Sequence, residues 1–345
     1  MKTKPLSKTL FSKNNLTVFL VLGLYAAASA LIYTDSASRQ FVNLIISLSC
    51  YIVLAVSLNL VVGFLGELSL GHAGFMSAGL FSGCLFSIAT ADLLPLAVRL
   101  PLSMILGGLF AALVGLIVGL PALRLRGDYL AIVTLACGEI IKNIITNLDI
   151  TGGALGLNTS SIKASTKTLL PFAIVLVLIT VLVMINFTRS KHGRAIMAIR
   201  DNRIAAESTG INVTYYKLLV FVLAAFFAGA AGVLYGHNFS IIKSTTFDYN
   251  MSIEILVMVV LGGMGNISGA IIATIILRTL PELLRDLSDY RMLAYSVLLI
   301  VIMILNANPK FNELRGRWSL KNLIAFCRKR FGKNKDAGKE ETRYE

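Results

Sequence analysis

The chain has 345 residues, of which 56% are apolar and only 14% are charged, and its formal net charge is +14. The apolar share lies above, and the charged share below, the values of soluble domains, which excludes an ordinary soluble globular protein. Runs of about 20 apolar residues, the length that crosses a bilayer, recur along the sequence. We therefore predict an all-α fold, a polytopic membrane helix bundle.

The positive charge is concentrated in three segments, 1–14, 188–217 and 307–345, which together hold 21 of the 32 lysines and arginines. Membrane proteins concentrate such residues in their cytoplasmic segments. The charge therefore indicates topology and attraction to anionic membrane lipid rather than nucleic acid, and it places both termini in the cytoplasm. An RNA-binding tail is the alternative for 307–345.

The first apolar run is longer than the core of a signal peptide, which has about 7–15 residues, so we predict an uncleaved span there. It separates a cytoplasmic N-terminal segment, 1–14, from the rest of a transmembrane domain, 15–306, which is followed by the tail. The predicted spans are 15–34, 41–62, 68–90, 97–120, 128–147, 169–187, 216–236, a broken stretch 252–279, and 290–306.

The broken stretch must cross the membrane zero or two times if the basic loop and the basic tail lie on the same side. Its middle reads "GGMGN", and glycine interrupts helices. We therefore predict two short helices joined by a turn at Gly262, Gly263 and Gly265, which either crosses twice or is re-entrant. Backbone outside helices at membrane depth must be covered by protein or water. The prediction amounts to about ten helical segments.

The third span begins with a stretch rich in small residues, "GELSLGHAGFMSAGLFSG". Small side chains let helices approach closely in lipid, which favours a tightly packed helix. The polar residues among them could instead gate a pathway near the cytoplasmic end. The candidates for helix packing or gating in this stretch are Gly66, Glu67, Ser69, Gly71, His72 and Gly74.

The fifth span carries polar residues at helical spacing. Glu139, Lys142, Asn143 and Thr146 share one helical face, and the first two can pair along it. Ionisable groups inside a span usually face a bundle interior or a water-filled cavity. We predict that this face lines a pathway, and a structural ion pair between packed helices is the alternative. Glu254 is a weaker pathway candidate.

Motifs for catalysis do not occur. The sequence contains no phosphate-binding loop, no H-E-x-x-H and no G-x-S-x-G, and its three histidines are scattered. We therefore predict that the chain is not an enzyme and has neither a cofactor nor a metal site. If it moves a solute against a gradient, the energy must come from an ion gradient or from a partner.

The segment Gly193–Asn212 is polar, although it lies between two long apolar runs. Asp201 and Asn202 interrupt a first short helix, and either can cap a second one that stops at Gly210. Two short helices on the cytoplasmic side predict a compact protruding knob. A plain solvated loop is the alternative.

The stretch "AIRDNRIAAESTGIN", 198–212, resembles the cytoplasmic-loop signature of LivM-type permeases, which are subunits of bacterial branched-chain amino acid ABC importers. Four more stretches resemble that family in order: "LNLVVGFLGELSLGHAGF", "LRLRGDYLAIVTLACGEII", "TGGALGL" and "SIEILVMVVLGGMGNISGAIIA". The resemblance covers residues 55–306.

The resemblance implies a permease domain at 15–306 whose cytoplasmic coupling loop, 188–215, docks into a groove on an ATP-hydrolysing subunit. The implied partners are two ATP-binding subunits, a second homologous permease and an external substrate-binding protein, in a bacterial cytoplasmic (inner) membrane. The implied solutes are branched-chain amino acids. The candidate coupling residues are Arg200, Asp201, Asn202, Ala205, Ala206, Glu207 and Gly210.

Two alternatives to this function stay open. One is an ABC permease for urea or another small polar solute, because the same broad family includes such proteins. The other is a proton-coupled secondary transporter, in which Glu139 and Glu254 carry the proton.

Overall fold

The structure is a computed structural model, and it describes residues 39–125 and 127–284. It also describes isolated positions, which are Gly23, Tyr25, Tyr290, Leu293, Ser296, Val297, Ile300 and Ile304. Segments 1–14 and 307–345, and most of the predicted spans 15–34 and 290–306, therefore lie outside the described residues. The chain divides into two compact units, Met1–Leu280 and Pro281–Glu345. Apart from the end of the last helix, every element described below belongs to the first unit.

The described part of the chain is a helix bundle. Its helices are α2 (Arg39–Asn59), α3 (His72–Ala89), α4 (Leu96–Ala122), α5 (Asp128–Asn147), α6 (Thr166–Arg189), α7 (Lys191–Asp201), α8 (Arg203–Ser208), α9 (Val213–Gly236), α10 (Tyr249–Gly262) and α11 (Ile267–Leu283). A π-helical segment, η2 (Leu60–Leu65), continues α2, and short 3-10 turns are η3 (Asp149–Thr151), η4 (Gly153–Leu155) and η5 (Ser244–Thr246).

Six of these helices, α2 with η2, α3, α4, α5, α6 and α9, are long and apolar enough to cross a bilayer. They match the predicted spans between residues 41 and 236 to within a few residues, apart from the start of the third. The chain is therefore an all-α, polytopic membrane helix bundle, as the sequence predicts.

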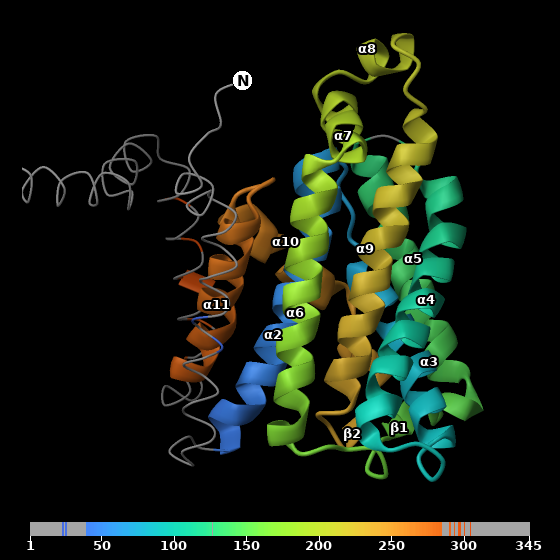
Figure 1. Cartoon of the computed structure of the whole chain (residues 1–345), viewed down its shortest axis with the longest axis vertical. Helices are drawn as coiled ribbons and strands as arrows, with labels where there is room; N and C mark the ends of the chain where they lie inside the picture. Colours follow the sequence, from blue (N-terminus) through green and yellow to red (C-terminus); the bar gives the residue numbers. More distant parts are fainter. Residues whose placement is uncertain are drawn as a thin grey trace, which may run out of the picture. The chain divides into compact units, whose positions relative to one another are not determined.

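The two ends of the bundle carry different structures (Figure 1). At one end, strand β1 (Leu157–Asn158), which follows α5, pairs antiparallel with strand β2 (Ile241–Ile242), which follows α9. Helices α7 and α8 lie at the other end (Figure 1). The segments after α5 and α9 therefore lie on the same side, and the loop between α6 and α9 lies on the opposite side, as the predicted topology requires.

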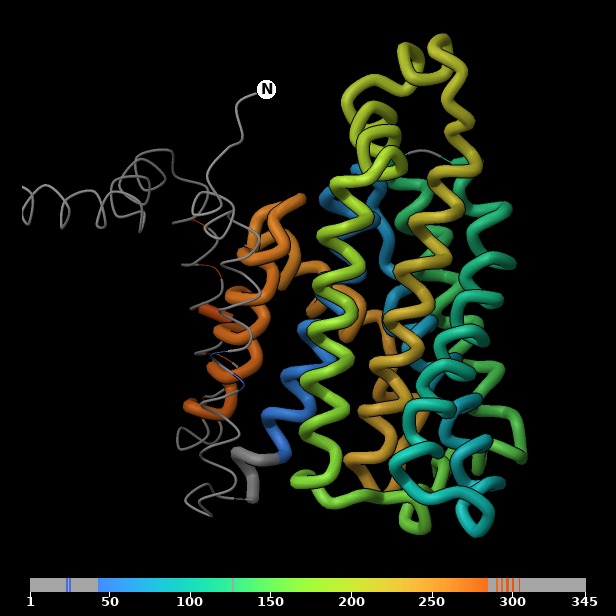
Figure 2. The backbone as a smooth tube through the Cα atoms, in the orientation of Figure 1, coloured from blue at the N-terminus to red at the C-terminus, as the bar shows by residue number. Residues whose placement is uncertain are grey.

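Glycines bring α3, α4 and α9 into close contact, and the three helices lie side by side (Figure 2). A Cβ atom on Gly79 of α3 would overlap the Cα of Gly229 on α9, and it would lie 2.9 Å from the carbonyl oxygen of Gly107 on α4. Close approach of this kind drives helix association in lipid, where packing replaces the hydrophobic effect.

The predicted glycine-broken pair is confirmed. Helices α10 and α11 are joined by a turn in which Gly263 and Gly265 have φ angles of +92° and +77°. Residues other than glycine adopt such values rarely. Gly262 packs directly on the backbone of Ala270 in α11, so the two short helices cross closely near the turn.

The predicted start of the third helix is wrong. Residues 66–71 are not helical, and α3 begins at His72. The preceding π-helix ends at Gly66, whose φ of +80° breaks the helical path. The freed backbone then finds partners elsewhere: the amide of Leu70, for example, donates to Thr134 Oγ1 at 3.0 Å. The bundle therefore contains a partly buried non-helical segment, in which Ser69 and Gly71 are buried and Gly66 and Leu68 are exposed.

Candidate functional site

The predicted two-helix knob between α6 and α9 is present in the structure as α7 and α8 (Figure 1). Asn202 Oδ1 accepts a hydrogen bond from the amide of Ala205 at 3.1 Å, so Asn202 is the N-cap of α8. Gly210 has a φ of +84° after α8, which is the left-handed conformation that ends helices. These two motif residues therefore shape the knob.

The tip of the knob exposes an apolar side chain that motif reasoning missed. Ile204 of α8 is 80% exposed, whereas Ala206 is buried. The two charged residues beside Ile204, Arg203 and Glu207, pair with each other at 2.9 Å. All the candidate coupling residues except Ala206 are also exposed, namely Arg200, Asp201, Asn202, Ala205, Glu207 and Gly210. An isolated isoleucine among polar residues was the sequence signal for this position.

Arg200 of α7 turns back toward the membrane helices. Its Nε and Nη2 donate to Asp201 Oδ1 at 3.0 and 2.9 Å, and its Nη1 donates to the carbonyl oxygen of Gly63 in η2 at 3.3 Å. Its aliphatic part lies over Gly66, where an added Cβ would be 2.7 Å from Arg200 Cγ. Arg200 therefore links the knob to the end of the second span.

The polar residues at and just before the start of α3 differ in their contacts. Glu67 forms an ion pair with Lys217 of α9, and their side chains are 15% and 3% exposed. His72 Nε2 lies 2.9 Å from Ser57 Oγ, so the histidine is a hydrogen-bonded partner between α3 and α2. The Ser69 hydroxyl is buried and has no hydrogen-bond partner within the described part of the chain.

Gly71 and Gly74 lie where α3 meets α5. A Cβ on Gly71 would be 2.6 Å from the carbonyl oxygen of Thr134, and one on Gly74 would be 2.7 Å from the Cα of Gly138. Both positions therefore exclude a side chain, and this geometry suits a packing role.

The predicted polar side of α5 contacts α10 and η5. Glu139 and Lys142 form an ion pair, and the other Glu139 oxygen accepts from the amide of Tyr249 at 3.0 Å, at the first turn of α10. Thr146 Oγ1 lies 2.6 Å from Ser244 Oγ. The structure thus brings Glu139 and Thr146 into contacts with other elements, Lys142 pairs with Glu139 within α5, and Asn143 stays exposed beside them.

The neighbouring face of α5 is open and mixed in polarity. The exposed residues along it are Ile132, Ala136, Ile140, Asn143, Ile144 and Asn147. On α4, by contrast, the exposed large residues are all apolar, and they are Val98, Leu102, Ile105, Leu106, Leu109, Phe110, Leu113, Leu116, Ile117 and Leu120. The α4 surface suits lipid, whereas uncovered amides in a span are costly in hydrocarbon. The α5 face therefore requires water or another protein.

Glu254 is paired as well. Arg278 of α11 donates to Glu254 Oε1 at 3.2 Å, and its guanidinium lies over the ring of Tyr51 at 4.0 Å from the ring centroid. This cluster joins α10, α11 and α2 by an ion pair and a cation–π contact.

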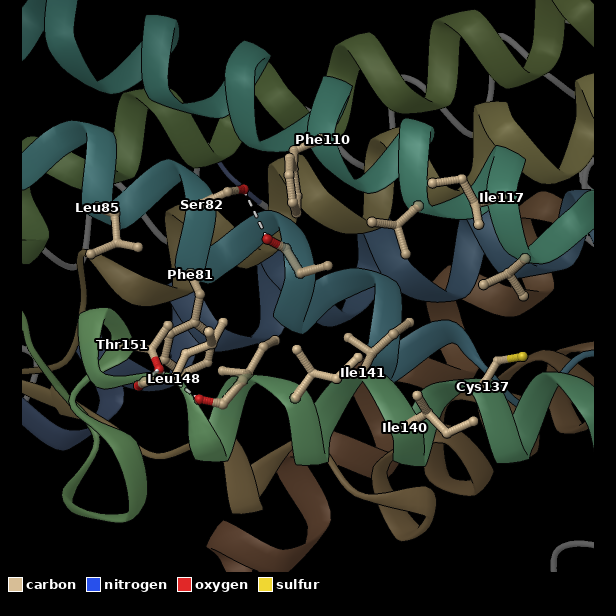
Figure 3. Close-up of a pocket in the computed structure, with 15 residues that line it drawn as sticks. Phe81, Ser82, Leu85, Phe110, Ile117, Cys137, Ile140, Ile141, Leu148 and Thr151 are labelled. Carbon is tan, nitrogen blue, oxygen red and sulfur yellow. Dashed lines mark hydrogen bonds between the residues drawn. The ribbon is translucent and has the colours of Figure 1, made fainter.

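An apolar groove of about 400 Å³ runs between α3, α4 and α5. Figure 3 shows Phe81 and Leu85 of α3, Phe110 of α4 and Ile141 of α5 around it. The groove lies next to the exposed apolar surface of α4, and its lining is suited to hydrocarbon rather than to a polar solute.

Comparison with known proteins identifies the family. The family described as "Branched-chain amino acid transport system / permease component" matches residues 40–307, which contain every helix described above except the first residue of α2. The chain belongs to this family. It is therefore a multi-pass membrane protein of the permease type, and the permeases of this family are transport components rather than enzymes.

Three relatives show how far the similarity within this permease family extends. The High-affinity branched-chain amino acid transport system permease protein LivM of Escherichia coli (strain K12) is 33% identical over 83% of this chain and 73% of its own length. The nucleoside ABC transporter permease protein NupB of Lactococcus lactis subsp. cremoris is 28% identical over 55% of this chain and 59% of its own. The permease LivH of E. coli is 27% identical over 43% of this chain and 49% of its own. No solved structure matches the chain significantly.

Proposed function

We propose that this chain is the membrane-spanning permease subunit of an ATP-driven importer for branched-chain amino acids in a bacterial cytoplasmic membrane. It forms half of the translocation pathway, and a second homologous permease forms the other half. Two ATP-binding subunits hydrolyse ATP on the cytoplasmic side, and an external binding protein delivers the solute. The family match and the similarity to LivM and LivH support this assignment.

The observation that carries the proposal is the exposed knob of α7 and α8. A bundle-end element with capped helices, paired charges and one isoleucine at its tip is a preformed surface for another protein. Apolar anchors that enter a partner's pocket carry most of the energy of an interface. The basic composition of the loop 188–217 supports a cytoplasmic position, where ATP is available.

Substitution of Ile204 by glutamate tests the coupling. We expect substrate-stimulated ATP hydrolysis by the purified importer to fall at least about tenfold, because loss of a central anchor costs about 2 kcal/mol or more. Ile204→Leu is the matched control and keeps the apolar contact. Amounts of the permease in the membrane should be similar for both variants, because the side chain contacts solvent in this chain. Equal hydrolysis by Ile204→Glu and the control would exclude the knob as the docking surface.

The exposed face of α5 is our candidate for the pathway wall. It presents Asn143 beside the Glu139–Lys142 pair, and such groups avoid lipid. In the assembled importer this face meets water and the second permease. Glu254 is the weaker candidate because Arg278 and Tyr51 already engage its surroundings.

Cysteine labelling checks this orientation. In a background without the native cysteines, Asn143→Cys in the assembled importer should react with a membrane-impermeant thiol reagent, and added solute should change the rate. Leu109→Cys on α4 is the control, because Leu109 is 54% exposed on an all-apolar surface that we assign to lipid. If the two cysteines react equally slowly, the α5 face does not border water.

A solute other than a branched-chain amino acid is the second candidate, and similarity to the nucleoside permease NupB favours it. Urea or another small polar solute belongs to the same alternative. Competition of unlabelled nucleoside, urea, isoleucine and valine against labelled leucine, in cells carrying the whole importer, separates these solutes.

A proton-coupled secondary transporter finds less support in the contacts. Glu139 is engaged by Lys142 and by a backbone amide, and Glu254 is engaged by Arg278. Both carboxylates therefore already serve contacts within the protein. Uptake that persists when the proton gradient is collapsed and ATP is maintained would separate the two mechanisms.

A further inference from the structure

Three segments that lie far apart in the sequence meet at one junction. They are the end of the second span with Asn59 and Gly63, the knob helix α7 with Arg200, and the turn between α10 and α11 with Gly265. Each segment belongs to one of the long motifs of the sequence. The junction is defined here by these four residues together with Gly66, over which Arg200 lies.

The first side of the junction joins η2 to the glycine turn. Asn59 Oδ1 accepts a hydrogen bond from the amide of Gly265 at 2.9 Å. A Cβ on Gly63 would overlap both Asn59 Oδ1 and the Gly265 amide nitrogen. The π-helix and the turn therefore lie backbone against backbone, and a displacement of one must displace the other.

The second side of the junction is Arg200. Its Nη1 donates to the Gly63 carbonyl oxygen. Its Nε and Nη2, on another edge of the guanidinium, both donate to Asp201 Oδ1. The planar fork of an arginine fixes its orientation when several donors are engaged. The side chain therefore connects α7 to η2 in a defined geometry.

The junction also has the features of a segment that rearranges. The segment η2 is a π-helix. Such helices are rare, and those that occur often lie at functional sites. The Nδ2 of Asn59 and the hydroxyl of Ser69 are buried without a hydrogen-bond partner among the described residues. Buried polar groups are normally satisfied, so another arrangement of this segment has hydrogen bonds to gain.

We propose that Arg200 is the positioning residue that transmits movement of the α7–α8 knob, through η2, to the turn between α10 and α11. This inference rests on the proposed function, because it requires that the knob is moved by a partner. It assigns Arg200 a role inside the permease rather than at the surface that the ATP-binding subunit contacts. The path from Arg200 to the turn runs through Gly63, where an added Cβ would overlap the Gly265 amide nitrogen.

Arg200→Gln in the complete importer, reconstituted in proteoliposomes, tests the activity. We expect substrate-stimulated ATP hydrolysis and transport to fall at least about fivefold, within the usual range of coupling between sites. Arg200→Lys should fall less, because it keeps one donor for Gly63. Arg194→Gln is the matched control on the same helix, since Arg194 contacts the carbonyl oxygen of Arg189 within its own loop. Equal activity of Arg200→Gln and Arg194→Gln would overturn the proposal.

A distance measurement separates transmission from a merely structural role. In a background without native cysteines, spin labels at Ser208→Cys on α8 and Met264→Cys in the turn report whether the two segments move together. With Arg200 present, we expect the same distance distribution with and without a non-hydrolysable nucleotide. With Arg200→Gln, nucleotide should shift the distribution, because α8 then moves alone. A shift in the arginine-containing protein, or none in the variant, contradicts the proposal.

The two proposals fail in different ways. If Ile204→Glu leaves ATP hydrolysis unchanged, the knob is not the docking surface, and the proposed transmission through Arg200 is excluded with it. If Ile204→Glu uncouples the importer but Arg200→Gln behaves like Arg194→Gln, the proposed function stands and only the transmission through Arg200 is excluded.

Discussion

Replacement of Lys217 by methionine should destabilise the folded protein by about 3 kcal/mol, at the lower end of the range for buried ion pairs, because it leaves a largely buried carboxylate without its cation. Lys217 lies in the first turns of α9 with its side chain 3% exposed, and Glu67 is its partner in the described part of the chain. Glu67 lies in the non-helical segment before α3, so the ion pair also holds that segment against α9. Denaturation of the detergent-solubilised protein measures the free energy of unfolding.

Two further variants make this prediction specific. Lys191→Met removes an exposed lysine at the start of α7 and should change stability by no more than about 0.5 kcal/mol. The double variant Glu67→Gln with Lys217→Met removes both charges, and it should recover part of the loss, since a buried pair replaced as a whole is often neutral. A double variant as unstable as the sum of its single variants would mean that the two residues do not act as a pair.

Alanine at two glycines of the same bundle should change stability in opposite directions. Gly79→Ala should cost about 1–3 kcal/mol, because its Cβ would overlap the Gly229 backbone, and backbone cannot turn aside as a side chain can. Gly138→Ala should be neutral or stabilise by up to about 1 kcal/mol, because its Cβ would meet Gly71 Cα at 3.5 Å, an ordinary contact, and alanine favours the helix.

The shift of thermal unfolding in detergent measures both glycine variants under identical conditions. The pair is its own control, because the substitution is the same and both positions lie within transmembrane helices. No loss of stability from Gly79→Ala would mean that α3, α4 and α9 are packed less closely than the structure has them. Similar destabilisation by both variants would mean that the chain is packed more closely around Gly138 than the structure has it.

The locally encoded features of this protein were predictable from the sequence. The spans follow from apolar runs, since each must satisfy its own backbone in lipid. The turn between α10 and α11 follows from its glycines, and the end of α7 and the start of α8 follow from Asn202, because capping depends on neighbours in the chain. The Glu139–Lys142 pair follows from helical spacing in the same way.

Only the tertiary structure decided which residues meet across the bundle. The start of α3 at His72, the pairing of Glu67 with Lys217 and the contact of Arg200 with Gly63 each depend on elements that are distant in the sequence. Glycine signals a close approach or a turn, but its missing side chain does not say which helix approaches. Helical periodicity likewise places Glu139 on a face of α5 without telling what covers that face. The sequence therefore determined the elements, their order across the membrane and the knob, and the packing of distant segments determined the contacts through which the knob reaches the membrane helices.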